Sequence, residues 1–157
     1  MNPKPQTCTG CTSYHTNQGY AGGEGDLTCD IVFVGEACGE TEAIEGRPFA
    51  GGTGRMLRMM IHQAGLNSTN YYLTNTVKCR PPANRTPTQE EITTCHDRYL
   101  AAELALIKPK VIVPVGETAL KHLLPTAPGG ITQLRGHVFD SAYGKLMPIV
   151  HPSFVAR

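Results

Sequence analysis

The sequence predicts an α/β domain of three layers, in which a central, mainly parallel sheet of four strands is flanked by helices. Two observations carry this prediction. Four short runs are apolar or β-branched, and they alternate with segments whose apolar residues recur at helical spacing. The chain of 157 residues is long enough for one ordinary core, so we expect residues 1–157 to form a single domain.

The predicted strands are residues 30–34, 71–77, 111–115 and 147–150. The first is a continuous apolar run that ends at Gly35, which is typical of a buried parallel strand. The second is rich in β-branched and aromatic residues. In the third, Pro114 cannot donate to the ladder, so we place it near the end of the strand. The fourth leads into His151.

Three helices are predicted between these strands. The first covers residues 54–63, where apolar side chains keep to helical spacing. Thr88-Gln-Glu-Glu91 is a capping box, and it opens a second helix whose apolar face runs through residues 92–106. The third helix covers residues 117–124.

Composition and charge narrow the function. A hydrophobic fraction of 40% with 17% charged residues describes a folded globular protein and excludes a disordered chain. The formal net charge is only +1, so a nucleic-acid surface would have to be local and built from loops. No apolar run approaches the ~20 residues of a membrane helix, and the N-terminus has no secretory apolar core. We therefore expect no membrane association and a cytoplasmic location, which for a viral protein is the host cytoplasm.

Three loops at the predicted strand ends concentrate polar residues and glycine: 35–54, 75–85 and 151–157. In open parallel sheets, ligands bind beyond the carboxyl ends of the strands. The first loop carries four Glu among repeated glycines, which allow close backbone approach to a ligand. It is neither a P-loop nor a dinucleotide fingerprint. Its plainer interpretation is a solvated acidic loop.

Three motifs follow one another along nearly the whole chain. They are Gly-Glu-x-x-Gly-x-x-Glu with Gly-Arg-Pro-Phe-x-Gly, then Thr-Asn-x-x-Lys-Cys-Arg-Pro-Pro-x-Asn-Arg-x-Pro, then Arg-Gly and His-Pro-Ser through Arg157. In this order they resemble the family 4 (iron–sulfur) uracil-DNA glycosylases. The resemblance implies a uracil-DNA glycosylase-like fold. It also implies a DNA repair enzyme that hydrolyses the N-glycosidic bond of uracil in DNA and leaves an abasic site.

The resemblance also assigns roles at the site, which the chemistry makes sensible. Breaking the bond creates an oxocarbenium-like sugar and an anionic base, so carboxylates are needed near the sugar and a donor near the base. The catalytic residues expected are Glu36 for the water, Glu42 for the cationic sugar, and His151 as donor to the uracil oxygen. The substrate-binding residues expected are Gly35, Ala37, Phe49, which stacks on the flipped base, and Asn75, which reads its edge. Taken alone, Phe49 also reads as core filler, Asn75 as a turn residue and His151 as a satisfied histidine.

The six cysteines fall into two groups in a compartment where thiols stay reduced. Cys8-x2-Cys11 is a ligand pair, Cys79 and Cys95 are single, and a zinc ribbon would need a second close pair. Uneven spacing of this kind suits a [4Fe–4S] cluster, which the resemblance implies for these four thiolates, while zinc stays open as the alternative. Cys29 and Cys38 are expected to be unligated. The metal would anchor the polar segment 1–28, which cannot pack alone.

The basic residues of the same loops are the expected contacts to DNA phosphates. They are Lys78, Arg80, Arg85, Arg135 and Arg157, each of which also reads as an ordinary surface charge.

The chain departs from the family pattern in its first motif and at its end. Cys38 stands where Pro is usual, Ala43 stands where Asp is usual, and the chain stops directly after the last motif. The replacement of Asp removes an acidic group expected near the site. An alternative function is therefore a catalytically weak or inactive glycosylase-like domain that binds DNA or docks on a replication or repair protein. A third possible function is that of a redox protein built around the cluster, since it too would use the thiols. We expect a monomer that acts on uracil-containing DNA.

Overall fold

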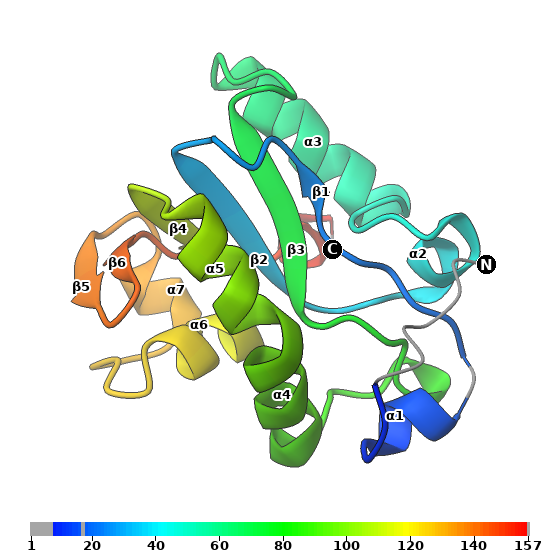
Figure 1. The fold of residues 1–157 in the computed structure, drawn as a ribbon. Coiled ribbons are helices and arrows are strands. Elements are labelled where there is room, and N and C mark those ends of the chain that lie inside the picture. Colours follow the sequence, from blue (N-terminus) through cyan, green and yellow to red (C-terminus); the bar gives the residue numbers. More distant parts are fainter. Residues whose placement is uncertain (1–7, 17, 157) are drawn as a thin grey trace.

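The computed structural model describes residues 8–16 and 18–156. One six-stranded sheet has the order β1-β3-β2-β4-β6-β5 (Figure 1). Its strands are β1 (Glu24–Gly25), β2 (Ile31–Ala37), β3 (Tyr71–Val77), β4 (Val111–Pro114), β5 (Phe139–Ser141) and β6 (Gly144–Leu146). The four central strands are parallel, and β1 and β5 add one antiparallel strand at each edge. The expected parallel core of four strands is therefore present, but the sheet has six strands instead of four.

The fourth parallel strand lies earlier in the chain than predicted. Strand β6 ends at Leu146, whereas the sequence pattern predicts a strand at residues 147–150. Pro148 has no N–H to donate, so the ladder is interrupted there. Pairing continues beyond it as one parallel bridge between Ile149 and Val115. The segment still follows β4, because the Ile149 N–H donates to the carbonyl of Pro114 over 2.9 Å.

The described helices include the three predicted ones and four short additions, α1, α2, α7 and α8. In chain order they are α1 (Thr12–His15), α2 (Glu40–Glu45), α3 (Gly52–Gln63), α4 (Gln89–Cys95), α5 (Ala101–Ile107), α6 (Glu117–Leu123), α7 (Ile131–Leu134) and α8 (Pro152–Val155). A π-helical turn, His96–Leu100, joins α4 to α5, so the predicted second helix has a wider turn at its middle. The capping box is confirmed: Glu91 N–H donates to Thr88 Oγ1, and Thr88 N–H donates to the Glu91 carboxylate.

Helices cover both faces of the sheet and give the predicted three layers (Figure 1). On one face, Phe33, Leu73 and Val113 pack against Leu57 and Ile61 of α3. On the other face, the strand side chains that alternate with these, Val32, Val34 and Ile112, pack against Leu104 of α5 and Leu120 of α6. Alternating burial of this kind is what a parallel sheet between two helical layers requires.

The N-terminal segment lies against the loop that follows β3. Tyr20 pairs with Cys79 in an antiparallel bridge, and the Ala21 N–H donates to the Lys78 carbonyl over 2.9 Å. Ser13 donates to the buried Glu91 carboxylate over 2.6 Å. The segment is thus attached through main-chain contacts to the loop that the sequence associates with it, and through a side-chain contact to α4. No helix in the described ranges is long and apolar enough to cross a membrane.

Candidate active site at the carboxyl edge of the sheet

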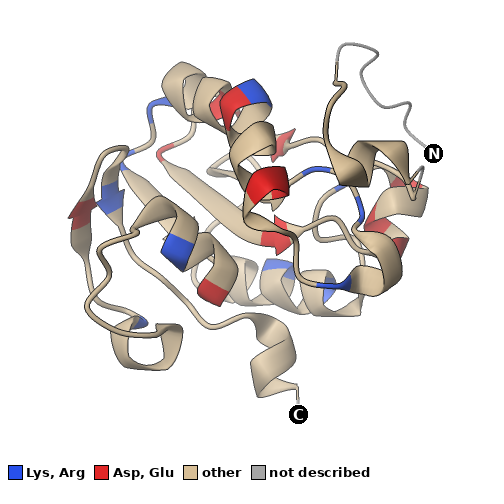
Figure 2. Ribbon diagram, turned by 90° about the horizontal axis from the view of Figure 1, so that it is seen from below, with Lys and Arg blue, Asp and Glu red and all other residues tan. Residues whose placement is uncertain are grey.

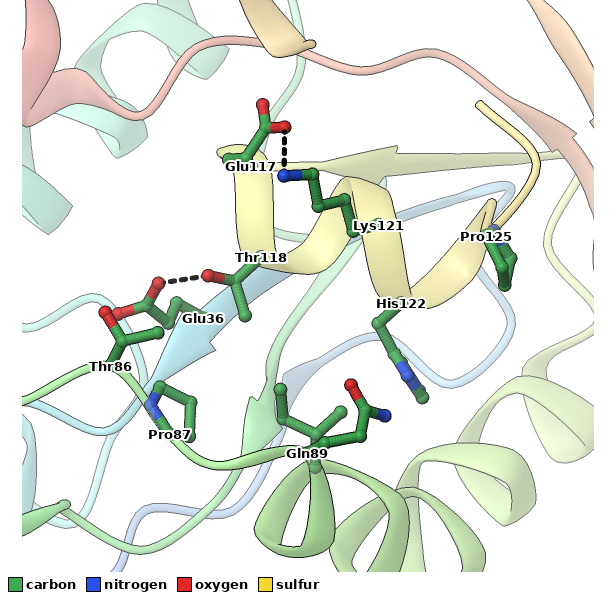
Figure 3. Close-up of a pocket in the computed structure, with 10 residues that line it drawn as sticks. Glu36, Thr86, Pro87, Gln89, Glu117, Thr118, Lys121, His122 and Pro125 are labelled. Carbon is green, nitrogen blue, oxygen red and sulfur yellow. Dashed lines mark hydrogen bonds and ion pairs between the residues drawn. The ribbon is translucent and has the colours of Figure 1, made fainter. Parts of the chain in front are cut away.

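Glu36 stands at the carboxyl end of β2, next to the start of α6. Its side chain accepts a hydrogen bond from the hydroxyl of Thr118, in the first turn of α6 (Figure 3). Its main-chain carbonyl accepts from Thr76 on β3. These two contacts hold the carboxylate at the strand tip, where it is half-buried.

His151 comes directly after the segment that pairs with β4, and it caps helix α8. Its Nδ1 accepts the Ser153 N–H over 3.2 Å and lies 2.7 Å from the Ser153 hydroxyl. Because Nδ1 accepts from the backbone, the ring proton lies on Nε2, which is then the atom able to donate to a ligand. Burial lowers the pKa of His151, and the charges of Glu36 and Glu42 only partly oppose this. The imidazole is therefore neutral at neutral pH.

The carboxylate of Glu36 and the imidazole of His151 line one pocket of about 230 Å³. Its other walls are formed by the turn from β4 into α6, residues 115–118, and by Ser153. Glu36 also stands at the end of a larger cavity of about 790 Å³, which runs between α4 and α6 past Lys121 and His122 (Figure 3). This cavity gives solvent a path to the Glu36 carboxylate.

Gly35, Phe49 and Asn75 meet beside this pocket. A Cβ atom on Gly35 would lie 2.3 Å from the Asn75 Oδ1 and 2.6 Å from the Phe49 ring, so only glycine fits. Asn75 is 3% exposed, and its main-chain carbonyl accepts the Lys78 ammonium over 2.8 Å. Phe49 belongs to the core on the α3 face, and its ring edge reaches this point. The structure thus brings together three of the four substrate-binding residues that the sequence predicts.

Glu42 lies on helix α2, and Ala37 is the last residue of β2. The Glu42 carboxylate accepts the Gly51 N–H over 2.8 Å, which joins helix α2 to the start of α3. Ala37 pairs with Val77 at the last rung between β2 and β3. Ala43, which stands where the family pattern has Asp, has different surroundings from Glu42. It is buried with Ala21 and Cys38, and a Cβ on Gly19 would lie 2.5 Å from its side chain. Ala43 therefore contacts the N-terminal segment.

Of the predicted ligand set, Cys8, Cys79 and Cys95 lie close enough to Tyr20 for their charges to act on its hydroxyl, and Cys8 and Cys11 act in the same way on Cys95. All six cysteines belong to the described residues, where they are buried and form no disulfide. Burial raises the pKa of Cys95 to about 11, and the charges of Cys8 and Cys11 add to this rise. Burial also raises the pKa of Tyr20, with added contributions from Cys95, Cys79 and Cys8. Across the described residues, no three Cys, His, Asp or Glu side chains converge closely enough to hold a single metal ion.

The predicted phosphate-binding residues divide into buried and exposed groups. Lys78 is 1% exposed, and its ammonium donates to Glu103 over 2.7 Å and to the Asn75 carbonyl over 2.8 Å, so it is not presented to DNA. Arg85 makes two 2.8 Å bonds to Glu91. Arg80 bonds Asn84 and Glu40, and Arg135 is exposed. The prediction for Arg157 lies outside the described residues.

Basic and acidic residues alternate over the described part of the ribbon in Figure 2, which shows no single basic face in that view. This agrees with the formal net charge of +1.

Thr118 and Ser153 are two site residues that the sequence does not single out. Both hold catalytic candidates in place, Thr118 through the Glu36 carboxylate and Ser153 through the His151 ring. Ser153 lies inside the last motif, two residues after the histidine, and a capping pattern is readable there. Nothing in the sequence around Thr118 indicates its contact with Glu36, because the two residues are 82 positions apart and only the fold brings them together.

The fold and this site define an α/β domain that presents a carboxylate, a neutral imidazole and a buried amide at one sheet edge. A family model described as "Uracil DNA glycosylase superfamily" matches residues 23–157. The chain is 40% identical to a type-4 uracil-DNA glycosylase of Thermotoga maritima, over 100% of this chain and 82% of that protein. It is 38% identical to a type-4 uracil-DNA glycosylase of Archaeoglobus fulgidus, over 95% of this chain and 78% of that protein. The chain therefore belongs to the uracil-DNA glycosylase superfamily, and within it to the type-4 group.

A further relative is a viral protein. A DNA polymerase of Bacillus phage SP01 is 32% identical over 86% of this chain, which corresponds to 14% of that protein.

Proposed function

We propose that this chain is a DNA repair hydrolase that removes uracil from DNA by cutting the bond between base and sugar. One observation carries the proposal: Glu36 and His151 line the same pocket, beside the point where Gly35, Phe49 and Asn75 meet. A binding module has no use for a carboxylate and a neutral donor that share a pocket in this way. The family membership of the chain supports the same activity.

Each residue then has a defined chemical role. As the C1′–N1 bond breaks, its electron pair passes to the uracil ring, and the sugar becomes cationic. The Nε2–H of His151 donates to the uracil oxygen that gains charge. Glu36 orients a water for attack on C1′ and accepts its proton. Glu42, held by Gly51, adds negative charge on the sugar side.

Recognition of the base follows from the neighbouring group. Uracil presents both a donor and an acceptor on its edge, and an amide such as that of Asn75 answers both. The base must leave the duplex stack before it can reach this buried amide. Phe49 provides the stacking surface, and the lack of a side chain at Gly35 leaves room for it.

We also propose that Cys8, Cys11, Cys79 and Cys95 hold a [4Fe–4S] cluster. The donors fit this group, because all four thiols are buried and the charges of Cys8 and Cys11 already reach Cys95. Neighbouring buried thiolates are stabilised when they bind a cationic centre. The bound cluster would supply a structural cross-link between the N-terminal segment and the loop after β3. Cluster thiolates require a reducing compartment, so we place the protein in the cytoplasm.

Contacts to the DNA backbone are assigned to Arg80 and Arg135, two described arginines that border the loops at this edge. Both are charged at all relevant pH values and match phosphate geometry. Lys78 and Arg85 are left out, because Glu103 and Glu91 hold their charges over 2.7 and 2.8 Å. The ion pair of Arg80 with Glu40 is longer, at 3.4 Å, and its carboxylate is exposed.

The test is a cleavage assay on an oligonucleotide with one uracil, followed by alkali to break abasic sites. Glu36→Gln and His151→Ala should each lower the single-turnover rate by about 100-fold or more. The matched controls make the same two changes at exposed helical positions outside the pocket, Glu90→Gln on α4 and His62→Ala on α3, and should leave the rate near wild type.

Absence of cleavage by cluster-loaded wild type that still binds DNA would favour the inactive docking domain. The polymerase relative makes a replication protein the first partner to try in that case.

A further inference from the structure

Arg58 of helix α3 holds the loop that carries Phe49. Its Nε donates to the Phe49 carbonyl over 3.1 Å, and its Nη2 donates to the Pro48 carbonyl over 2.7 Å. The same Nη2 also contacts the Glu24 carboxylate of β1 at 3.0 Å. One guanidinium therefore joins two consecutive loop carbonyls to the edge of the sheet. The side chain is 24% exposed, so these bonds are partly shielded from water.

The loop needs such support because the backbone of Phe49 is strained. Its φ angle is +54°, in the left-handed region that residues other than glycine rarely adopt. A conformation of this kind persists where the surrounding structure over-determines it, and it is common at functional sites. On the far side, Gly54 closes the space: a Cβ there would lie 2.3 Å from the Phe49 carbonyl.

Arg47 shows what is specific to Arg58. It too contacts Glu24, with Nε–Oε2 of 3.1 Å and Nη2–Oε1 of 2.8 Å. Among the described contacts, however, Arg47 touches no carbonyl of the loop, and 54% of its side chain is exposed. The two arginines thus share one carboxylate, and only Arg58 extends that ion pair to the backbone of Phe49.

We propose that Arg58 is a positioning residue for base recognition. It holds Phe49 in its left-handed conformation, so that the ring edge stays against Gly35 and Asn75, and the ion pair with Glu24 fixes the guanidinium in place. The inference rests on the proposed function, since it takes Phe49 as the ring that stacks on the flipped uracil. It adds a residue of helix α3, outside the three motifs of the sequence, to the set that determines how uracil is bound.

The kinetic test compares Arg58→Ala, Arg58→Lys and Arg47→Ala. Arg58→Ala should lower the single-turnover rate on uracil DNA by about tenfold or more, since small misplacements of positioning groups cost this much. Its affinity for the same DNA with thymine in place of uracil should change by less than about twofold, because backbone contacts stay intact. Arg58→Lys should recover part of the rate, as one ammonium reaches one carbonyl. Arg47→Ala should stay near wild type.

The structural test does not depend on activity. The chain has four phenylalanines, so fluorinated phenylalanine gives a simple ¹⁹F spectrum in which Phe49→Leu assigns the Phe49 signal. Arg58→Ala should shift or broaden that signal alone, and Arg47→Ala should leave it in place. If Arg58→Ala does not fold, Arg58→Lys takes its place, with a smaller shift expected.

Two outcomes would overturn the inference: an unmoved Phe49 signal in the Arg58 variants, or an equal drop of rate in Arg47→Ala. If the wild type cleaves no uracil DNA, the proposed function fails, while the spectrum still decides whether Arg58 positions Phe49.

Discussion

The guanidinium of Arg85 binds the carboxylate of Glu91 at two points, with Nη1–Oε2 and Nη2–Oε1 both at 2.8 Å. The same carboxylate accepts from Ser13 of the N-terminal segment and from the Thr88 N–H. Glu91 is 1% exposed. One buried carboxylate thus joins the N-terminal segment, the loop after β3 and the start of α4, and it does so with protein contacts alone.

This junction makes the stability depend on acid pH. The bonds from Arg85, then those from Ser13 and Thr88, lower the pKa of Glu91 to about 2 against the cost of burial. Because the pKa of Glu91 is lower in the folded state, the ionised carboxylate stabilises the fold at pH values above its pKa in the unfolded chain, about 4.3. This stabilisation is lost as the pH falls towards 2. The free energy of unfolding of wild type in urea should decrease over this window, whereas Glu91→Gln should be less stable at pH 7 and flatter with pH. Parallel pH profiles for the two proteins would contradict the assignment.

The arginines should differ in the salt dependence of DNA binding. Removing one phosphate-binding charge changes the slope of log K against log salt by about 1. Arg135→Ala should reduce the slope by this amount, because Arg135 is exposed at the site edge. Arg85→Gln should leave the slope unchanged and lower thermal stability instead, because its charge is held by Glu91. Fluorescence anisotropy over a salt series measures both, and a reduced slope for Arg85→Gln would return that residue to the DNA surface.

Restoring the acidic residue of the family pattern should destabilise this chain. Ala43 is 3% exposed and packs against Ala21, Cys38 and Gly19. Ala43→Asp would bury a carboxylate without a dedicated partner, at a cost of about 1–3 kcal/mol. Ala43→Ser, nearly as small and uncharged, is the control. Unfolding free energies measure the cost, and the cleavage rate of the folded fraction should not rise; a faster enzyme would place position 43 in the reaction.

Removal of one proposed cluster ligand should abolish the colour and weaken the attachment of the N-terminal segment, which keeps its hydrogen bonds to Lys78 and Glu91. Cys95→Ser should eliminate the absorbance near about 400 nm that an iron–sulfur protein shows, and should lower the melting temperature. Cys29→Ser is the matched control, because Cys29 is equally buried but lies in the core under α5 and α6. Colour that survives in Cys95→Ser would remove this residue from the ligand set, and a colourless wild type with bound zinc would select the alternative metal.

Much of the fold can be predicted because its information is local. The apolar run at 30–34 and the β-branched and aromatic run at 71–77 predict strands, and both correspond to central parallel strands, β2 and β3. The capping box at Thr88 needs only four residues to be recognised. Residues 147–150 are apolar, so the pattern predicts the fourth strand there. Pro148 lacks an N–H and interrupts the ladder, and the strand lies earlier, ending at Leu146. Helix α2 gives no signal, since Ala43 is its one buried residue and no apolar period can be detected.

The site is less accessible from sequence, because its contacts cross the fold. A surface position is the natural prediction for Lys78, as lysines are usually exposed. Its burial depends on Glu103, 25 residues further on, which the π-helical turn and α5 bring to β3. Arg58 and Thr118 give no signal for the same reason. The sequence can rank candidate site residues that lie inside its motifs. It does not reveal residues outside the motifs that hold those candidates in position.

The distance along the chain between Glu36 and His151 has a consequence for how activity arises. The acid is laid down with the first parallel strand, and the imidazole arrives only after β6, where the Gly116 N–H donates to the Ile149 carbonyl over 2.9 Å. A chain that ended after β6 would keep the thiols and Asn75, but it would lack Ile149, which packs against the core on the α3 face, and His151, the donor to the departing base. The two catalytic candidates therefore come together only once the segment that carries Ile149 has paired beside β4.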